Sequence, residues 1–217
     1  MTVSRALLLA TVSLAGAAVA AEPAGQDSFV ARLKALALLE SLNAELLSHD
    51  SATETLQRWC DVHGIAPGAA ITARRVRGAD KPADEAVRRD LGAGPAEPVR
   101  YRHVQLVCGG RVLSEADNWY LPARLTPQMN RELDETDRPF GAVVKGLGFH
   151  RRTVSATLLF QPLPEGWDRS ALPPAALAPM TTPPKVLEHR AILTTAEGAP
   201  FSVVVETYTD QVLGTAH

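Results

Sequence analysis

Residues 99–121 read VRYRHVQLVCGGRVLSEADNWYL, and they contain the clearest β pattern of the chain. Two strand-like runs, Val99–Val107 and Val112–Leu121, flank the sequence Cys-Gly-Gly-Arg. A glycine pair between two such runs is typical of a tight β-hairpin. The runs Val186–Thr195 and Phe201–Val212 predict a second hairpin across a four-residue loop. The second half of the chain is therefore expected to build an antiparallel sheet.

Two further strands are predicted outward from these hairpins. The segments Ala69–Arg77 and Phe149–Phe160 both alternate apolar and polar residues. Residues 78–98 and 162–184 carry glycine and proline and are expected to be loops, with one helical turn near Glu85–Arg89.

Helices are predicted mainly at the start of the chain. Leucine spacing indicates a helix over Phe29–Ser48 and a second over Ser51–His63, which Gly64 ends. Thr126-Pro127 opens a third helix that runs to about Glu135, and residues 138–148 predict a turn and a short helix. Helices followed by hairpin-linked strands indicate an α+β fold with a single, mostly antiparallel sheet.

The first 20 residues have the features of a secretory signal peptide. Arg5 precedes the apolar run Ala6–Ala17, and small residues occupy the positions before Ala21. The run is shorter than the roughly 20 residues that a membrane-spanning helix needs. We expect cleavage before Ala21, a periplasmic or secreted location and no membrane association of the mature chain. Residues 21–217 then form one domain, in which a helical segment (21–64) joins a sheet-bearing part (65–217).

Composition excludes several classes of function. With 22 Lys and Arg, 24 Asp and Glu and a formal charge of −2, the scattered basic residues give no footprint for nucleic acid. No histidine pairs at metal-ligand spacing, and HExxH, GxSxG and Walker patterns are absent from the sequence. We therefore expect a monomer without metal or cofactor. Cys60 and Cys108 could form a disulfide in an exported protein or lie separately in the core, and both alternatives stay open.

Two charged residues share strand faces with apolar ones. Arg102 lies on the same face as Val104 and Leu106, and Glu206 lies on the same face as Val204. A charge near a core is costly unless it is paired or has a task. The alternative for each is a solvated residue or a structural salt bridge.

Several segments together resemble the chorismate pyruvate-lyase family. The segment RHVQLVCGG at 102–110 is similar to its strand-and-turn motif, and TDRPFG at 136–141 to its Thr-Pro-Leu-Gly segment. The segment GAPFSVVVET at 198–207 resembles its terminal strand. The resemblance covers residues 65–215 in the same order, and the signal peptide indicates an exported subgroup.

The resemblance implies a fold, a reaction and a site. The fold is a single antiparallel sheet with helices on one side and a buried pocket, and the reaction converts chorismate to 4-hydroxybenzoate and pyruvate without metal or cofactor. Arg102 matches the arginine that binds the ring carboxylate. Glu206 matches the catalytic glutamate. Phe140 and Gly141 match the segment that supplies backbone donors and an apolar wall.

One departure concerns a second arginine. Asp117-Asn118 stands where the family usually has Gly-Arg, so the contact to the enolpyruvyl carboxylate lacks its usual residue. Arg124, Arg152 and Arg190 are candidates to replace it.

Three functions fit these residues. The first is an exported lyase acting on chorismate or a related enolpyruvyl or cyclohexadiene carboxylate. The second is a non-catalytic binding module for a small aromatic acid, and the third is a structural protein with a degenerate pocket. The presence of both Arg102 and Glu206 favours the first two.

Overall fold

A computed structural model of the chain describes residues 29–78, 80–169 and 179–214. The predicted signal peptide and the cleavage position before Ala21 lie outside these residues.

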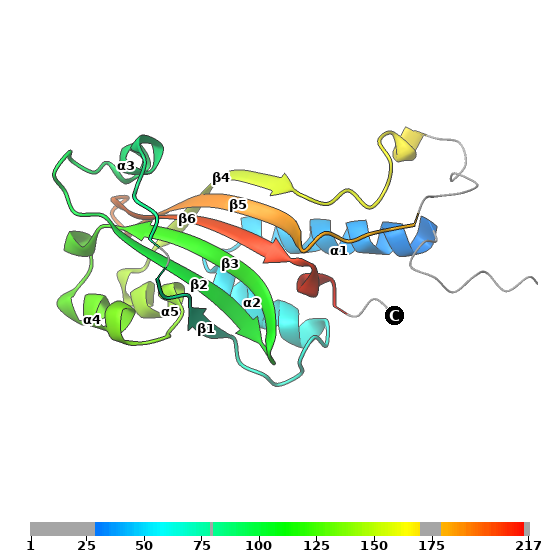
Figure 1. Cartoon of the computed structure of the whole chain (residues 1–217), viewed down its shortest axis with the longest axis horizontal. Coiled ribbons are helices and arrows are strands. Elements are labelled where there is room, and N and C mark those ends of the chain that lie inside the picture. Colours follow the sequence, from blue (N-terminus) through cyan, green and yellow to red (C-terminus); the bar gives the residue numbers. More distant parts are fainter. Residues whose placement is uncertain (1–28, 79, 170–178, 215–217) are drawn as a thin grey trace, which may run out of the picture.

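All six strands form one antiparallel sheet in the order β1-β2-β3-β6-β5-β4 (Figure 1). Both predicted hairpins are present, as β2–β3 and β5–β6. The strands are β1 (Thr72–Arg75), β2 (Arg100–Cys108), β3 (Arg111–Tyr120), β4 (His150–Leu158), β5 (Lys185–Thr194) and β6 (Pro200–Thr209).

The β2–β3 turn requires its two glycines. Gly109 and Gly110 both have positive φ, of 54° and 85°, as a tight hairpin turn needs. A Cβ at Gly109 would also come within 2.2 Å of the Ala66 Cβ. The loop after the second helix thus packs directly on the turn.

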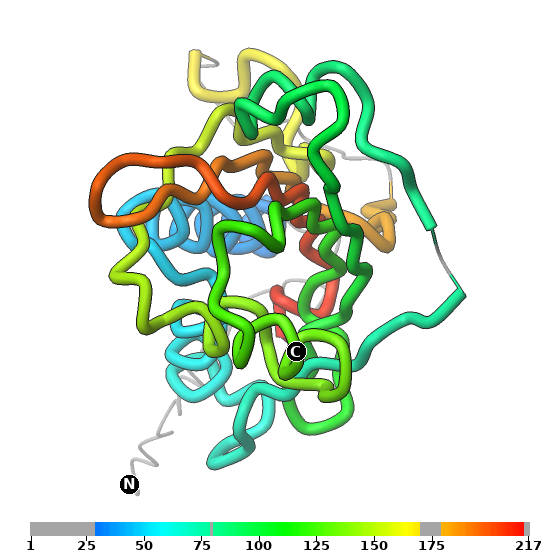
Figure 2. The backbone as a smooth tube through the Cα atoms, turned by 90° about the vertical axis from the view of Figure 1, so that its left-hand side faces the viewer, coloured from blue at the N-terminus to red at the C-terminus, as the bar shows by residue number. Residues whose placement is uncertain are grey.

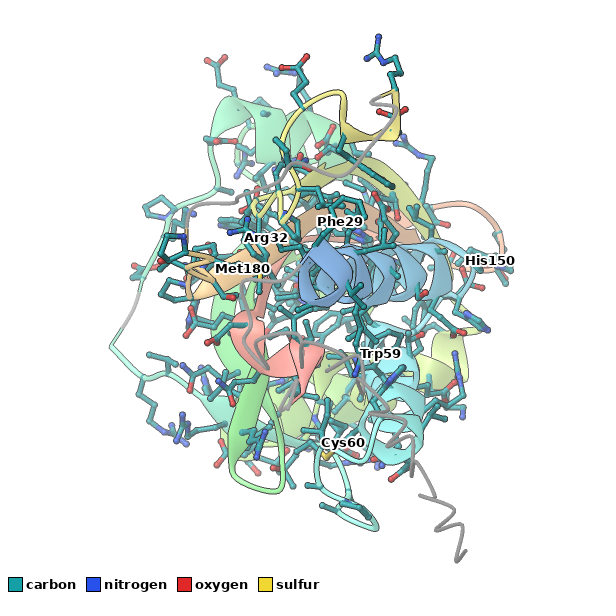
Figure 3. All side chains as sticks on the ribbon, turned by 90° about the vertical axis from the view of Figure 1, so that its right-hand side faces the viewer. Phe29, Arg32, Trp59, Cys60, His150 and Met180 are labelled. Carbon is teal, nitrogen blue, oxygen red and sulfur yellow. A yellow bond between two sulfur atoms is a disulfide. The ribbon has the colours of Figure 1, made fainter. Side chains whose placement is uncertain are left out.

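Most helices cover one face of the sheet, as predicted. These are α1 (Phe29–Leu47), α2 (Ala52–Val62), α4 (Pro127–Glu135) and α5 (Phe140–Val144). In Figure 3, α1 is viewed nearly end-on beside α2, which carries the labelled Trp59 and Cys60. Leucines of α1 and α2 join Leu113 and Tyr208 of the sheet in the largest hydrophobic cluster. The predicted α+β class is confirmed.

One short helix lies on the other face. Helix α3 (Glu85–Leu91) buries Val87 and Leu91 against Trp119, Ile192 and Val203. Figure 2 shows α3 across the sheet from α2. The sheet is therefore packed on both faces at this place, which explains why both faces of β6 are apolar.

Some element ends differ from the sequence prediction. The last strand ends at Thr209 instead of Val212, because the Thr209 hydroxyl caps a 3₁₀ turn over Asp210–Leu213 by accepting the Gln211 N–H. Strand β1 has four residues instead of the nine of Ala69–Arg77. The predicted loop 162–184 lies partly outside the described residues, and its described part contains a 3₁₀ turn, Trp167–Arg169.

The two cysteines form a disulfide. Cys60 of α2 and Cys108 at the end of β2 are bonded, which decides between the two alternatives that the sequence leaves open. Both residues are fully buried in the core under the β2–β3 turn. None of the helices among the described residues is long and apolar enough to cross a membrane.

Candidate functional site

A small cavity lies between the sheet and the N-terminal ends of α2 and α5. Its enclosed space is about 40 Å³, which is room for a few water molecules, and it opens to solvent at a mouth. Its walls are mainly apolar, with polar groups at the two ends. The lining residues are Asp50, Ser51, Ala52, Thr53, Val104, Leu106, Ala116, Asn118, Phe140, Gly141, Phe149, Arg151, Leu193, Val204 and Glu206.

A buried ion pair forms one end of the cavity. Arg151 of β4 donates from Nη2 to Oε2 of Glu206 on β6 at 2.5 Å, and the Tyr208 hydroxyl lies 3.2 Å from the same oxygen. The side chains of Arg151 and Glu206 are only 3% and 10% exposed. Burial opposes the charge of Arg151, but Glu206 outweighs it and raises the pKa of the guanidinium. The hydrogen bonds fix the position of the Glu206 carboxylate.

A buried histidine lies next to this ion pair. His189 is directly opposite Glu206 in the β5–β6 register and is fully buried. Its Nε2 is 2.8 Å from Oδ1 of Asn43 on α1, so Nε2 carries the proton in this contact. Burial and then the charge of Arg151 lower the pKa of His189 to about 4, against the effect of Glu206. His189 is therefore neutral at pH 7.

Arg102 is a buried cation of a different kind. It is 2% exposed, and its Nη2 donates to the carbonyl oxygens of Thr136 at 3.1 Å and Arg138 at 3.0 Å. Among the described residues, no partner accepts from Nε or Nη1, and no carboxylate lies within salt-bridge distance. Burial, and then the charge of Arg75, lower the pKa of Arg102. An arginine in this position has capacity for two more acceptors.

The predicted site residues share one face of the sheet. Glu206, Phe140 and Gly141 line the cavity. Arg102 lies just outside the lining, next to Asn118 in the β2–β3 register, and Asn118 itself lines the cavity. Two strand spacings and two residues along the strand separate Arg102 from Glu206, which places their Cα atoms roughly 12 Å apart.

Arg151 is an arginine of the cavity lining that the sequence did not point to. Of the predicted replacements, Arg124 donates to the carbonyl oxygens of Leu91 and Pro200, and Arg190 pairs with Asp90 at 2.8 Å. Arg152 is not among the lining residues. The alternation of side chains along the strand could have identified Arg151. Arg151 lies two residues after Phe149 and therefore points to the same side as this aromatic residue.

Asp117 stands where chorismate pyruvate-lyases usually have part of a Gly-Arg pair. It lies on the face of the sheet opposite the cavity. Its carboxylate accepts from Tyr101 at 2.6 Å and Lys81 at 2.8 Å, and lies 2.8 Å from Nδ1 of His103. Partial burial tends to raise the pKa of Asp117, but these contacts outweigh it and lower the pKa to about 2. The cluster ties β2 to β3 and takes no part in the cavity.

No cluster of three His, Cys, Asp or Glu residues suited to a metal ion occurs in the described part of the chain. The charged side chains of the lining are Asp50, Arg151 and Glu206, and Arg102 lies just outside it.

Several solved structures are similar to the chain, among them transcriptional regulators of the GntR family. The PhnF protein of Mycobacterium smegmatis is 19% identical with a TM-score of 0.46, and the match covers 75% of this chain and 64% of that one. The effector domain of PhnF alone is 17% identical with a TM-score of 0.45, covering 74% and 89%. A GntR-family regulator from Bacillus cereus is 12% identical with a TM-score of 0.40, covering 65% and 92%. At these values the likeness does not indicate a function.

Sequence comparison gives a much nearer relative. No protein-family model matches the chain. The uncharacterized protein y4mC of Sinorhizobium fredii is 55% identical over 186 residues, which cover 85% of this chain and 78% of the relative. Identity at this level and over this length shows common descent. The chain belongs to the family of the Sinorhizobium fredii protein y4mC.

Proposed function

We propose that this protein binds a small aromatic or cyclohexadiene carboxylic acid in the cavity, with the carboxylate directed to Arg102. The observation that carries the proposal is the state of Arg102, which is buried, charged and without a carboxylate partner among the described residues. Burying an unpaired charge costs several kcal/mol, so such a residue is expected to have a task. A ligand carboxylate at Nη1 would supply one of the missing acceptors through a charge-assisted hydrogen bond.

The opposite end of the cavity suits a hydroxyl group. Both recorded contacts of the Glu206 carboxylate go to Oε2, and no donor among the described residues reaches Oε1. A ligand hydroxyl could donate to this oxygen. Between the two ends, Phe140 and Phe149 offer apolar walls for a flat ring. The order of the groups therefore matches that of 4-hydroxybenzoate, and its ring requires the walls to move apart because the enclosed space is only about 40 Å³.

The test is calorimetric titration of the protein with 4-hydroxybenzoate. Arg102→Met should abolish measurable binding, because it removes the only charged partner proposed for the ligand carboxylate. Arg124→Met is the matched control, since Arg124 also donates to carbonyl oxygens but lies away from the cavity. Equal affinity of Arg102→Met and the wild type would refute the assignment.

A second candidate function is the elimination of pyruvate from chorismate or a related enolpyruvyl carboxylate. Arg151 favours it, because it provides a second cation in the cavity for a ligand with two carboxylates. Glu206 would take the proton from the ring carbon that bears the hydroxyl. The C–O bond to the enolpyruvyl group would then break, and the ring would become aromatic. This function would be supported if the wild type releases pyruvate from chorismate and Glu206→Gln does not. If the wild type releases no pyruvate, only the binding function remains.

Export to the periplasm or medium is part of the proposal. The Cys60–Cys108 disulfide supports it, because such bonds persist mainly in oxidising compartments. Mass spectrometry of the protein recovered from the periplasmic fraction should find an N-terminus at Ala21. An intact Met1 in that fraction would contradict it.

A further inference from the structure

Asn118 is a buried amide whose orientation is fixed by one neighbour. It belongs to β3, is only 3% exposed and lines the cavity. Ser202, which is fully buried on β6, donates from Oγ to Oδ1 of Asn118 at 2.8 Å. Because the amide oxygen is turned toward this hydroxyl, the amide nitrogen Nδ2 is turned away from it. Ser202 therefore decides which end of the amide faces the cavity.

The amide nitrogen of Asn118 has no acceptor in the part of the chain that the structure describes. The one hydrogen bond of this side chain is the bond that Oδ1 accepts from Ser202. Its neighbours on the same face of the sheet, Ala116 and Val204, also line the cavity and offer no side-chain acceptor. Buried polar groups of folded proteins nearly always have a partner, so the free N–H groups point to an oxygen that enters from the cavity.

Arg102 lies directly opposite Asn118 in the β2–β3 register, and the two side chains share one face of the sheet. Opposite residues of antiparallel strands have Cα atoms about 5 Å apart. Nη1 of Arg102 also lacks an acceptor among the described residues. One end of the cavity therefore has two neighbouring residues with donors to spare, one charged and one neutral.

We propose that Asn118 is a second binding residue for the ligand carboxylate. Nδ2 of Asn118 donates to one carboxylate oxygen, and Nη1 of Arg102 donates to the other. Ser202 is a positioning residue, because it acts through the amide of Asn118 and does not line the cavity. The inference rests on the proposed function and deepens it, because it names how the cavity recognises the acid.

The arrangement distinguishes a carboxylate from a carboxamide of the same size. A carboxylate has an acceptor for each of the two donors. A carboxamide has one oxygen, so its NH₂ group would face the N–H groups of either Arg102 or Asn118. Two donors that face each other leave both without an acceptor, which weakens binding. The distinction depends on the orientation of the Asn118 amide, which Ser202 sets.

The experiment measures the affinities of 4-hydroxybenzoate and 4-hydroxybenzamide by calorimetric titration. Asn118→Leu, a change to an apolar side chain of similar size, should weaken binding of the acid on the order of tenfold, as expected for the loss of a hydrogen bond to a charged group. Asn118→Asp should abolish binding of the acid, because two carboxylates would then face each other. The same variant should bind the benzamide at least as tightly as the wild type does, because aspartate accepts from the ligand NH₂ group. Binding of the benzamide also shows that the variant is folded.

Ser202→Ala tests the orientation of the amide separately. Without the hydroxyl, Asn118 can turn its oxygen toward the cavity and accept from a ligand NH₂ group. The ratio of acid affinity to benzamide affinity should therefore fall several-fold, which a general loss of packing would not cause. Ser114→Ala is the matched control, since Ser114 is also buried on β3 but does not line the cavity, and it should leave the ratio unchanged.

The outcomes separate this inference from the proposed function. If the wild type binds 4-hydroxybenzoate and Asn118→Leu binds it equally well, the inference is overturned alone, and Nδ2 contacts only water. A ratio that Ser202→Ala leaves unchanged, or loss of both ligands in Asn118→Asp, would also overturn it. If the wild type does not bind 4-hydroxybenzoate, the proposed function falls together with the inference.

Discussion

Reduction of the Cys60–Cys108 disulfide should remove a large part of the stability of the fold. The bond closes a loop with a sequence separation of 48. The chain-entropy relation then gives a stabilisation of about 4 kcal/mol at 25 °C. Both sulfur-bearing residues are 0% exposed, so reduction changes little in the packing of the core beyond the bond itself. The loop contains β1, α3 and most of β2, and the bond restrains all of them in the unfolded chain.

Urea unfolding with and without a strong reductant measures this effect. With a denaturant slope of about 2 kcal/mol/M, the midpoint should fall by about 2 M on reduction. A double variant, Cys60→Ala with Cys108→Ala, is the control and should unfold at the same midpoint in both conditions. A loss below about 1 kcal/mol would refute the loop-closure reasoning. Free thiols in the unreduced, denatured protein would refute the disulfide.

Three further perturbations test the buried charges. Arg102→Met should preserve or raise the free energy of unfolding, because it removes a buried cation without a carboxylate partner, while 4-hydroxybenzoate binding falls by about 2–5 kcal/mol. A large loss of stability in urea would instead make Arg102 a structural residue. Glu206→Leu should destabilise the protein by about 3–5 kcal/mol, since it leaves Arg151 unpaired, and adding Arg151→Leu should recover most of this loss. If the double variant is no more stable than the single one, the pair is not the cause. The pKa of His189 is lowered from 6.5 to about 4, so the unfolded chain takes up its proton first. Stability should fall by on the order of 3 kcal/mol as the pH drops from about 6.5 to 4, and a curve unchanged by His189→Gln would contradict this.

The sequence predicted the sheet well, because each hairpin is encoded locally. The β2–β3 turn needs two residues with positive φ, and Gly109 and Gly110, which directly join the two strands, supply them. The last strand was predicted too long, because Asp210–Leu213 continues the apolar pattern while a side-chain cap ends the strand. Whether these residues extend the strand or form a capped turn is decided by single hydrogen bonds. The alternation of apolar and polar residues does not show these bonds.

The candidate site could be predicted only in part. Alternation placed Arg102 with apolar residues of its strand, but in the last strand it favoured the face of Phe201, Val203 and Val205 as core. Only the family resemblance paired Arg102 with Glu206, and both residues are buried. The partner of Glu206 comes from β4, two strands away in the sheet and 55 residues away in sequence. The strand order that brings Arg151 to Glu206 depends on β4 pairing with β5, a contact between strands that are not joined by a tight turn and that no local pattern specifies. Arg151 was therefore missed, although the parity of Phe149 could have suggested its direction.

The two buried arginines of the site differ in what they leave to a ligand. Arg151 is already held by Glu206, so it fixes the position of that carboxylate. Arg102 has only carbonyl partners among the described residues, and these neutralise none of its charge. An anion that reaches Arg102 gains most of a buried ion pair, because the guanidinium has already lost its water. Selectivity for acids should therefore come from Arg102. Selectivity for the group at the opposite end of the ligand should come from Glu206.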